Sequence, residues 1–260
     1  MATLKQPQLG QTILALRQEK KITQEELVDR CNVSVRTIQR IEAGEVTPRD
    51  STLKIILESL DYDFNQIQDR SQKKRRLDLL NVAWIMGTIY FLTGIAESFL
   101  DFYRFEIDLP IYYSWTYTSV KLIILATYIF FMFGFVEIGK IHNNAFLKIS
   151  AILMLGSMSI MEFYDIITLF SNFSEEEFLL VKGIEGVVFA GIDIAFGVAL
   201  FKLASELGDL SRIAGILQIL AGLCFLSFVL GFIGLFILLP ATILQIMLIY
   251  KVFDRLKAAQ

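Results

Sequence analysis

"RSQKKRRLDLLNVAWIMGTIYFLTG", residues 70–94, changes from strongly basic to strongly apolar within a few positions. Five of its first seven residues, Arg70 to Arg76, are Lys or Arg, and none of the seven is acidic. The apolar stretch that follows is about twenty residues long, the length that a helix needs to cross the hydrocarbon core of a bilayer. The stretch therefore predicts a boundary between a water-exposed part of the chain and a membrane part.

The composition places most of the chain in lipid. Of its 260 residues 55% are hydrophobic, and the mean hydropathy of +0.56 lies above that of soluble domains. Residues 1–76 carry 14 Lys or Arg and 11 Asp or Glu, a net charge of +3, whereas residues 77–260 carry 10 and 16, a net charge of −6. The two cysteines fall in different parts and there is one histidine, so a disulfide framework and His-rich metal or catalytic sites are excluded.

Upstream of the boundary, the sequence has the signals of several short helices. Thr23 with Glu26 three residues later is a capping-box pattern that starts a helix. Asn32 suits the left-handed conformation of a tight turn, and Ser34 can cap a further helix that Gly44 ends. Two helices joined by a turn of three or four residues, among four or five helices in all, make a helix-turn-helix arrangement.

The stretch "TQEELVDRCNVSVRTIQRIEAGEVTP", residues 23–48, resembles the phage-repressor type of helix-turn-helix, the Cro/C1 or XRE family. The "TQ-E-L" and "VS…I..IE.G…P" elements and the leucine-rich helix after them occur at the spacing of that family, and the resemblance extends over residues 9–63. It implies an all-α, lambda-repressor-like DNA-binding domain, which we place at residues 1–66. The whole chain then resembles a membrane-bound XRE-like regulator.

The resemblance also implies which residues contact DNA. In the family, the Gln that opens the second helix binds phosphate or base, and the first turns of the third helix enter the major groove. A structural ion pair joins the first and third helices, which here would be Arg17 with Glu42. The residues that this places on DNA are Gln24, Ser34, Val35, Arg36, Thr37, Gln39 and Arg40.

The charge of this domain is modest for a DNA-binding protein. Glu25, Glu26 and Asp29 keep the second helix acidic, so the affinity of one domain should be weak, because phosphate neutralisation supplies much of DNA binding. Pairing of two domains would compensate, and we expect a homodimer or a higher homo-oligomer. The alternative is that the fold acts as a protein-docking module.

Downstream of a basic connector at residues 67–78, the chain predicts a membrane domain of six transmembrane helices over residues 79–260. The last two helices form a nearly continuous apolar run, which we divide at "GFIG" (231–234), where the glycines and the following Pro240 permit a tight reversal. The expected spans are 79–99, 118–139, 148–170, 181–202, 213–231 and 235–253.

Positive charge in the short loops orients these spans. The loops that follow the first and third spans have little positive charge: residues 101–117 hold Arg104, and residues 171–177 hold three acids and no base. With six spans all basic groups fall on one side, so we expect both termini in the cytoplasm, at a bacterial inner membrane. The basic groups are Lys73, Lys74, Arg75 and Arg76, then Lys140 and Lys148, then Lys202 and Arg212, and finally Lys251, Arg255 and Lys257.

The spans also resemble three tandem copies of a two-helix unit. "LLNVAWIMG" (79–87), "KISAILMLG" (148–156) and "AGILQILAG" (214–222) align without gaps. Repeats in the same orientation would surround an axis along the membrane normal. The alternative is chance similarity between short apolar strings.

Ionisable residues inside membrane spans are costly and therefore informative. Glu162 and Asp165 are three residues apart, as are Lys182 and Glu185, so each pair shares one helix face. Faces that point inward would form a polar pocket open to the outer side and would serve as a sensor. The alternative is internal ion pairing with snorkelling at the interface, which we favour for Glu97, Asp101 and Lys182.

Asp193 lies near the middle of the fourth span, where snorkelling does not explain it. It should face another helix and meet one of four partners there. These partners are Lys182, Lys121, Gln218 and Gln245. The full candidate cluster or sensor is Lys121, Glu162, Asp165, Lys182, Glu185 and Asp193.

The sequence contains no hydrolase, kinase or zinc-protease signature, and we expect neither an enzyme nor a cofactor or metal. The function that it favours is a membrane-tethered, sequence-specific DNA-binding transcription regulator. Its partners would be double-stranded DNA, the lipid bilayer, a second copy and an unknown signal ligand. The alternative is a membrane transporter, channel or enzyme with a regulatory helix-turn-helix appendage.

Overall fold

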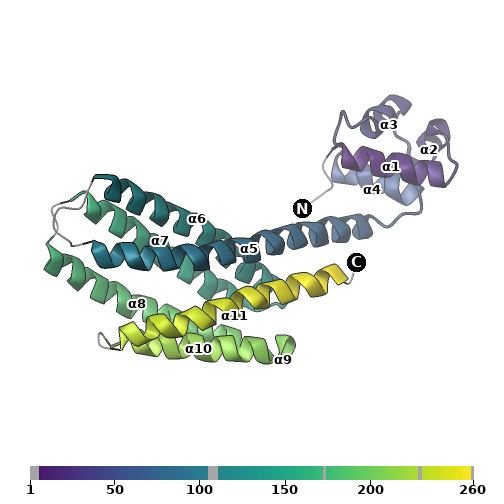
Figure 1. Cartoon of the computed structure of the whole chain (residues 1–260). Helices are drawn as coiled ribbons and strands as arrows, with labels where there is room; N and C mark the ends of the chain where they lie inside the picture. The colour runs from purple at the N-terminus through teal and green to yellow at the C-terminus, as the bar shows by residue number, and fades with distance from the viewer. Residues whose placement is uncertain (1–5, 105–110, 172–173, 228–229, 259–260) are drawn as a thin grey trace. The chain divides into compact units, whose positions relative to one another are not determined.

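The computed structural model of the chain describes residues 6–104, 111–171, 174–227 and 230–258 (Figure 1). These residues form helices and no strand, which confirms the all-α class. The chain divides into two compact units, Met1–Arg76 and Leu77–Gln260. Helix α5 (Phe64–Tyr103) begins in the first unit and continues into the second.

Four short helices precede α5 in the N-terminal unit. Thr23 and Glu26 form the capping box: the Glu26 N–H donates to Thr23 Oγ1 at 3.1 Å, and the Thr23 N–H donates to Glu26 Oε2 at 2.7 Å. Asn32 ends the same helix with φ 52°, the left-handed conformation that its short polar side chain tolerates. The helices are α1 (Gln8–Glu19), α2 (Gln24–Cys31), α3 (Val35–Glu42) and α4 (Asp50–Ser59).

The core of the N-terminal unit is a cluster of buried aliphatic side chains from all four helices. Helices α1 and α3 cross closely at Gly10, where an added Cβ would clash with the carbonyl oxygen of Ile41. The side chain of Gln6 supports this crossing, since its Nε2 donates to the carbonyl oxygens of Ile41 and Val46. The buried residues are Leu9, Ile13, Ile22, Leu27, Cys31, Ile38, Ile41, Leu53, Ile56, Leu57 and Leu60.

The C-terminal unit contains the rest of α5 and six further helices. They are α6 (Ile111–Ile141), α7 (Ala145–Leu169), α8 (Glu175–Lys202), α9 (Ala204–Leu207), α10 (Asp209–Phe225) and α11 (Gly231–Ala258). Among the described residues, five helices are long and apolar enough to cross a membrane, namely Gln72–Tyr103, Tyr113–Ile141, Ala145–Leu169, Glu176–Lys202 and Gly231–Ala258. Helix α10 has 17 residues, so the six crossings and the threefold repeat remain predictions.

The reversal between the last two helices lies earlier than the sequence predicted. Helix α10 ends at Phe225 and α11 begins at Gly231, so the "GFIG" stretch opens α11 and Pro240 lies inside that helix. Membrane helices tolerate an internal proline, and two glycines do not by themselves stop a helix in an apolar setting. Residues 105–110, 172–173 and 228–229 of the predicted loops and span ends lie outside the described residues.

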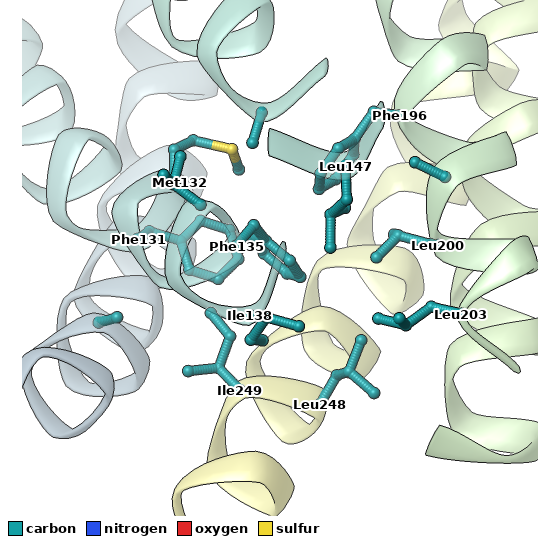
Figure 2. Packing of buried hydrophobic residues seen from close by; sticks show 14 of the residues in the cluster. Phe131, Met132, Phe135, Ile138, Leu147, Phe196, Leu200, Leu203, Leu248 and Ile249 are labelled. Atoms are coloured by element: carbon teal, nitrogen blue, oxygen red, sulfur yellow. The ribbon is translucent and has the colours of Figure 1, made fainter. Parts of the chain in front are cut away.

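Helix α6 lies at the centre of the C-terminal unit. In its most apolar window 67% of residues are buried, compared with 17–33% in the other four long helices. Phe135 packs against Phe196 of α8 with ring centres 5.1 Å apart, and Phe131 packs against Tyr90 of α5 at 5.9 Å. Figure 2 shows Phe131 and Phe135 among the buried side chains of this core. The other long helices surround α6 and expose much of their apolar surface.

Several helix ends of the C-terminal unit meet at one end. His142, which follows α6, contacts the carboxylate of Glu206 in α9. From α11, Lys251 Nζ donates to the carbonyl oxygen of Leu207 at 2.8 Å, and Arg255 donates to that of Glu206 at 3.4 Å. The ends of α6 and α11 and the start of α10 therefore lie together, and α10 with α11 forms a hairpin, as Figure 1 also shows.

Candidate nucleic-acid interface and polar cluster

Helix α3 has one buried face and one exposed face. Ile38 and Ile41 are fully buried in the core of the N-terminal unit. Arg36, Gln39 and Arg40 point away from that core and are exposed. The periodicity of the helix thus separates the residues that hold α3 in place from those that can contact a ligand.

The N-terminus of α3 is fixed by its own side chains. Ser34 Oγ accepts the N–H of Thr37 at 3.2 Å and contacts Thr37 Oγ1 at 2.8 Å. Ser34 is exposed, whereas Val35 and Thr37 are half-buried. The remaining amides of the first turn carry the positive end of the helix dipole, which favours a phosphate there.

A chain of hydrogen bonds connects α1, α2 and α3 beneath this face. Arg17 Nε donates to Glu42 Oε1 at 2.7 Å, and Arg17 also donates to Glu42 Oε2 at 3.1 Å. Gln24 Nε2 donates to Glu42 Oε2 at 2.7 Å, and Gln39 Nε2 donates to Gln24 Oε1 at 3.2 Å. The hydrogen bonds with Glu42 raise the pKa of Arg17 above its ordinary value.

This arrangement gives Gln24 a structural neighbour that the sequence did not reveal. The buried ion pair holds Gln24, and Gln24 in turn orients Gln39 on the exposed face of α3. No local sequence pattern predicts these hydrogen bonds, because the partners are 15 to 25 residues apart in the chain. The two amides are thus held in position by contacts within the N-terminal unit.

The two arginines of the exposed face differ in their surroundings. Among the described residues Arg36 has no ion-pair partner. Arg40 Nε lies 3.3 Å from Glu45 Oε2, and both side chains are more than half exposed. An exposed pair of this kind contributes little free energy, so a phosphate or a base edge can replace Glu45 as the partner of Arg40.

In the C-terminal unit, five of the six predicted cluster residues lie together. Lys121 Nζ forms an ion pair with Glu97 and lies 2.8 Å from Asp165 Oδ2. It also lies 3.4 Å from Asp101 Oδ1 and 3.5 Å from Glu162 Oε2. A second ammonium, that of Lys182, contacts Asp165 Oδ1 and Glu185 Oε2. We use the name outer cluster for Glu97, Asp101, Arg104, Lys121, Glu162, Asp165, Lys182 and Glu185.

Three members of the outer cluster, Glu97, Asp101 and Arg104, were not in the cluster predicted from the sequence, and Arg104 was expected only as a loop residue. Its side chain is buried and donates to Tyr117 Oη at 2.8 Å, to the Asp165 carbonyl oxygen at 3.0 Å and to Thr168 Oγ1 at 2.6 Å. Its guanidinium also lies 4.2 Å from the ring centre of Phe178. Arg104 thereby connects the end of α5 to α6, α7 and α8.

Asp193 lies apart from the outer cluster. Its Oδ1 accepts a hydrogen bond from Gln218 Nε2, and Gln218 Oε1 accepts one from Gln245 Nε2. All three residues are buried, and Asp193 Oδ2 has no hydrogen-bond partner in the described part of the chain. Of the partners expected from the sequence, Gln218 is the one that contacts Asp193.

No metal-binding group of three or more His, Cys, Asp or Glu occurs within the described ranges. The comparisons with known proteins identify the N-terminal unit alone. Residues 13–67 match the family model described as Helix-turn-helix, which supports a DNA-binding domain in this unit. No curated protein and no solved structure matches the chain.

Proposed function

We propose that the chain is a membrane-tethered, sequence-specific DNA-binding transcription regulator. The observation that carries the proposal is the exposed face of α3, with Arg36, Gln39 and Arg40 outward, in a unit whose sequence matches a helix-turn-helix family. Arginine donates in pairs to guanine or to phosphate, and glutamine can pair with adenine in the major groove. Gln39 and the two arginines provide such donors on one helix.

The tether is α5 together with the apolar helices of the C-terminal unit. Large apolar side chains such as Leu92, Phe99 and Trp115 are 60%, 66% and 72% exposed. A water-soluble protein rarely leaves so much apolar surface uncovered, and lipid would cover it. Helix α5 (Phe64–Tyr103) contains the last residues of the first unit and the first candidate membrane span.

Both termini are proposed to lie in the cytoplasm of a bacterium, at its inner membrane. Helices α10 and α11 form a hairpin, so the end of α11 is on the same side as the start of α10. Lys202, Lys251 and Arg255 belong to that end of the unit, and positive charge at the ends of membrane helices favours the cytoplasmic side, which supports this orientation. This proposal requires that α10 crosses the bilayer.

Sequence-specific binding can be tested on the full-length chain in lipid nanodiscs. A random duplex library is used to select a binding sequence, and the variant with Arg36→Ala and Arg40→Ala is then measured on that duplex. We expect each Arg to contribute about tenfold to a hundredfold in affinity. The slope of log affinity against log salt should also fall by about 1 for each phosphate that the variant no longer neutralises.

Lys54→Ala is the matched control, because Lys54 is an exposed cation of the same unit on α4. It should leave the affinity nearly unchanged. Equal binding by the double arginine variant, or no selected sequence at all, would refute direct readout and favour a protein-docking module. Pairing of two copies is tested on the same sample, since a homodimer should select two half-sites at a fixed spacing.

A transporter or channel with a regulatory appendage remains the second candidate, and the chain of Asp193, Gln218 and Gln245 favours it. Buried ionisable groups within membrane units often mark the path of an ion or proton. Ion flux in liposomes that is lost on Asp193→Asn would place transport ahead of regulation. Flux that is absent, or equal in both proteins, would leave the three residues a structural role.

A further inference from the structure

Lys121 faces more carboxylates than it has protons to donate. Its ammonium carries three N–H groups, and four carboxylates lie within 3.5 Å of its nitrogen. Glu162 is the one that is left over. It is 2% exposed, its Oε2 lies farthest from Lys121 Nζ, and that oxygen has no hydrogen-bond donor in the described part of the chain.

The charges of the outer cluster do not balance either. It contains five carboxylates, from Glu97, Asp101, Glu162, Asp165 and Glu185. Within the described ranges three cations oppose them, and these are Arg104, Lys121 and Lys182. Four of these eight residues, Arg104, Lys121, Glu162 and Asp165, are buried, where an unbalanced negative charge is costly. Carboxylates that share one buried site do not all remain ionised, so the cluster favours the uptake of a cation.

We propose that the outer cluster is a proton-binding site, that Glu162 takes up the proton, and that its occupancy controls how firmly α5 is held against α6 and α7. A proton needs no additional room. A metal ion or an amine would have to displace the Lys121 ammonium, which already occupies the centre and whose side chain is 3% exposed.

The proton has a way into the site. The side chains of Asp101 and Lys182 are 45% and 25% exposed, and they lie at the edge of the cluster, while Lys121 and Glu162 lie inside. Asp101 is connected to the interior by its contact with Lys121 and by a hydrogen bond from Tyr117 Oη at 2.8 Å. Polar groups thus lead from the exposed edge to Glu162.

The effect of the proton on α5 follows from the partners of Lys121. When Glu162 is neutral, three carboxylates remain for three N–H donors, and two of them, Glu97 and Asp101, belong to α5. When Glu162 is ionised, its carboxylate competes for the Lys121 ammonium and repels the carboxylates of Glu97 and Asp101. Low pH on the outer side should therefore hold α5 firmly, and high pH should loosen it.

The groups that act on Glu162 come from every element packed around it. They are Tyr90, Glu97 and Asp101 of α5, Lys121 of α6 and Asp165 of α7, while Arg104 and, from α8, Lys182 and Glu185 surround Asp165. Helix α5 also leads to the DNA-binding unit. A response of DNA binding to the proton therefore rests on the proposed function, whereas the proton site does not.

Infrared titration of the full-length chain in nanodiscs tests the site directly. The carbonyl stretch of a buried protonated carboxyl should be present at low pH and disappear at high pH. Glu162→Gln should remove this band, and Glu162→Asp should shift its pH midpoint. Asp193→Asn is the matched control, because Asp193 is a buried carboxyl outside the outer cluster that also has an oxygen without a donor in the described part of the chain. A band that Asp193→Asn removes and Glu162→Gln leaves would overturn the proposal.

The contact of α5 with α6 is measured with spin labels at Ile95 of α5 and Leu122 of α6, whose side chains are both exposed, in a chain whose native cysteines are replaced by Ala. The distance distribution should broaden at high pH in the otherwise unchanged chain and stay narrow with Glu162→Gln. Glu97→Gln should broaden it at every pH. A distance distribution that does not change with pH would overturn the proposed control of α5 by the proton. Neither measurement needs DNA, so failure here is distinct from failure of the duplex-binding experiment.

Discussion

Gln218 of α10 donates a hydrogen bond from Nε2 to Oδ1 of Asp193 in α8, and both side chains are buried. Gln245 of α11 donates in turn to Gln218 Oε1. Three helices are therefore joined by side-chain hydrogen bonds within an apolar unit. In such surroundings each polar group depends on its neighbour, because a group left alone loses its partner without gaining water.

We expect Asp193→Leu and Gln218→Leu each to destabilise the C-terminal unit, by about 1–2 kcal/mol. Each single change leaves a buried polar group without its partner. The double variant should be less destabilised than the sum of the two, because no unpaired group then remains between these positions. Thermal unfolding in detergent of the four proteins provides the cycle. Additive losses would mean that the two side chains do not stabilise each other.

The number of membrane crossings is decided by labelling at the two ends of α10. In a chain without its native cysteines, Ser227→Cys should react with a membrane-impermeant thiol reagent added outside intact cells. Ser205→Cys should react only after the cells are opened, because it lies at the end that we assign to the cytoplasm. Labelling of both positions from the same side would show that α10 does not cross, and would place the two termini on opposite sides.

Helix α10 packs against α8 through glycine, and enlarging that glycine should separate the two helices. A Cβ on Gly215 would lie 2.6 Å from the carbonyl oxygen of Gly197 and from the backbone nitrogen of Phe201. Gly215→Ala should therefore lower the thermal stability by about 1–3 kcal/mol. Gly191→Ala is the control, because nothing lies within 4 Å of the added Cβ. Equal melting temperatures for the two variants would contradict this packing.

Glu42 should be important for the fold of the N-terminal unit as well as for its DNA face. Glu42→Ala leaves the Arg17 guanidinium and the Gln24 amide without their acceptor, at side chains that are 13% exposed for Arg17 and 5% for Glu42. We expect a loss of about 2 kcal/mol in the free energy of unfolding. The separate variant Arg17→Lys should keep only part of the stability that the Arg17–Glu42 pair provides, because lysine cannot donate in the same paired geometry. Chemical denaturation followed by amide exchange in α1 and α3 measures both.

The capping box of α2 should weaken in acid. The hydrogen bonds from Thr23 lower the pKa of Glu26 below its ordinary value of 4.5. Because the folded pKa is lower than the unfolded one, the contribution is complete above pH 4.5 and is lost as the pH falls through the lowered folded value. Amide exchange at the start of α2 should therefore accelerate below that pH, after correction for the intrinsic rate.

Glu26→Gln separates this titration from others in the unit. Glutamine keeps an acceptor for the Thr23 N–H but does not titrate, so the acid-dependent step at α2 should disappear. The exposed pair of Lys20 and Asp61 also lowers the pKa of Asp61, and its acid response should persist in this variant. Persistence of the step at α2 would assign it to another group.

Local signals in the sequence predicted the helix ends well. The capping box at Thr23, the left-handed turn at Asn32 and the cap at Ser34 each involve residues three or four apart, so they are visible in a single sequence. The exposed face of α3 could be predicted in the same way, because the spacing of Ile38 and Ile41 indicates the opposite, buried face. Periodicity and turn chemistry are sufficient where the partners are close in the chain.

Contacts between distant segments could not be predicted in the same way. Arg104 was expected in a loop, but its partners in α7 are 61 and 64 residues away. The close crossing at Gly10 depends on the backbone of α3, and the end of α10 depends on packing rather than on the glycines of "GFIG". The excess of carboxylates around Lys121 also becomes visible only when the three helices α5, α6 and α7 are brought together.

Cys31, at the end of α2, gives the chain a natural chemical probe. Its side chain is buried in the core, and burial raises the pKa of the thiol above its ordinary value, so little of the reactive thiolate forms while the domain is folded. The speed of alkylation at Cys31 thus reports how often the DNA-binding unit opens. Any duplex that binds the folded unit should slow this reaction, even in the unmodified, full-length chain.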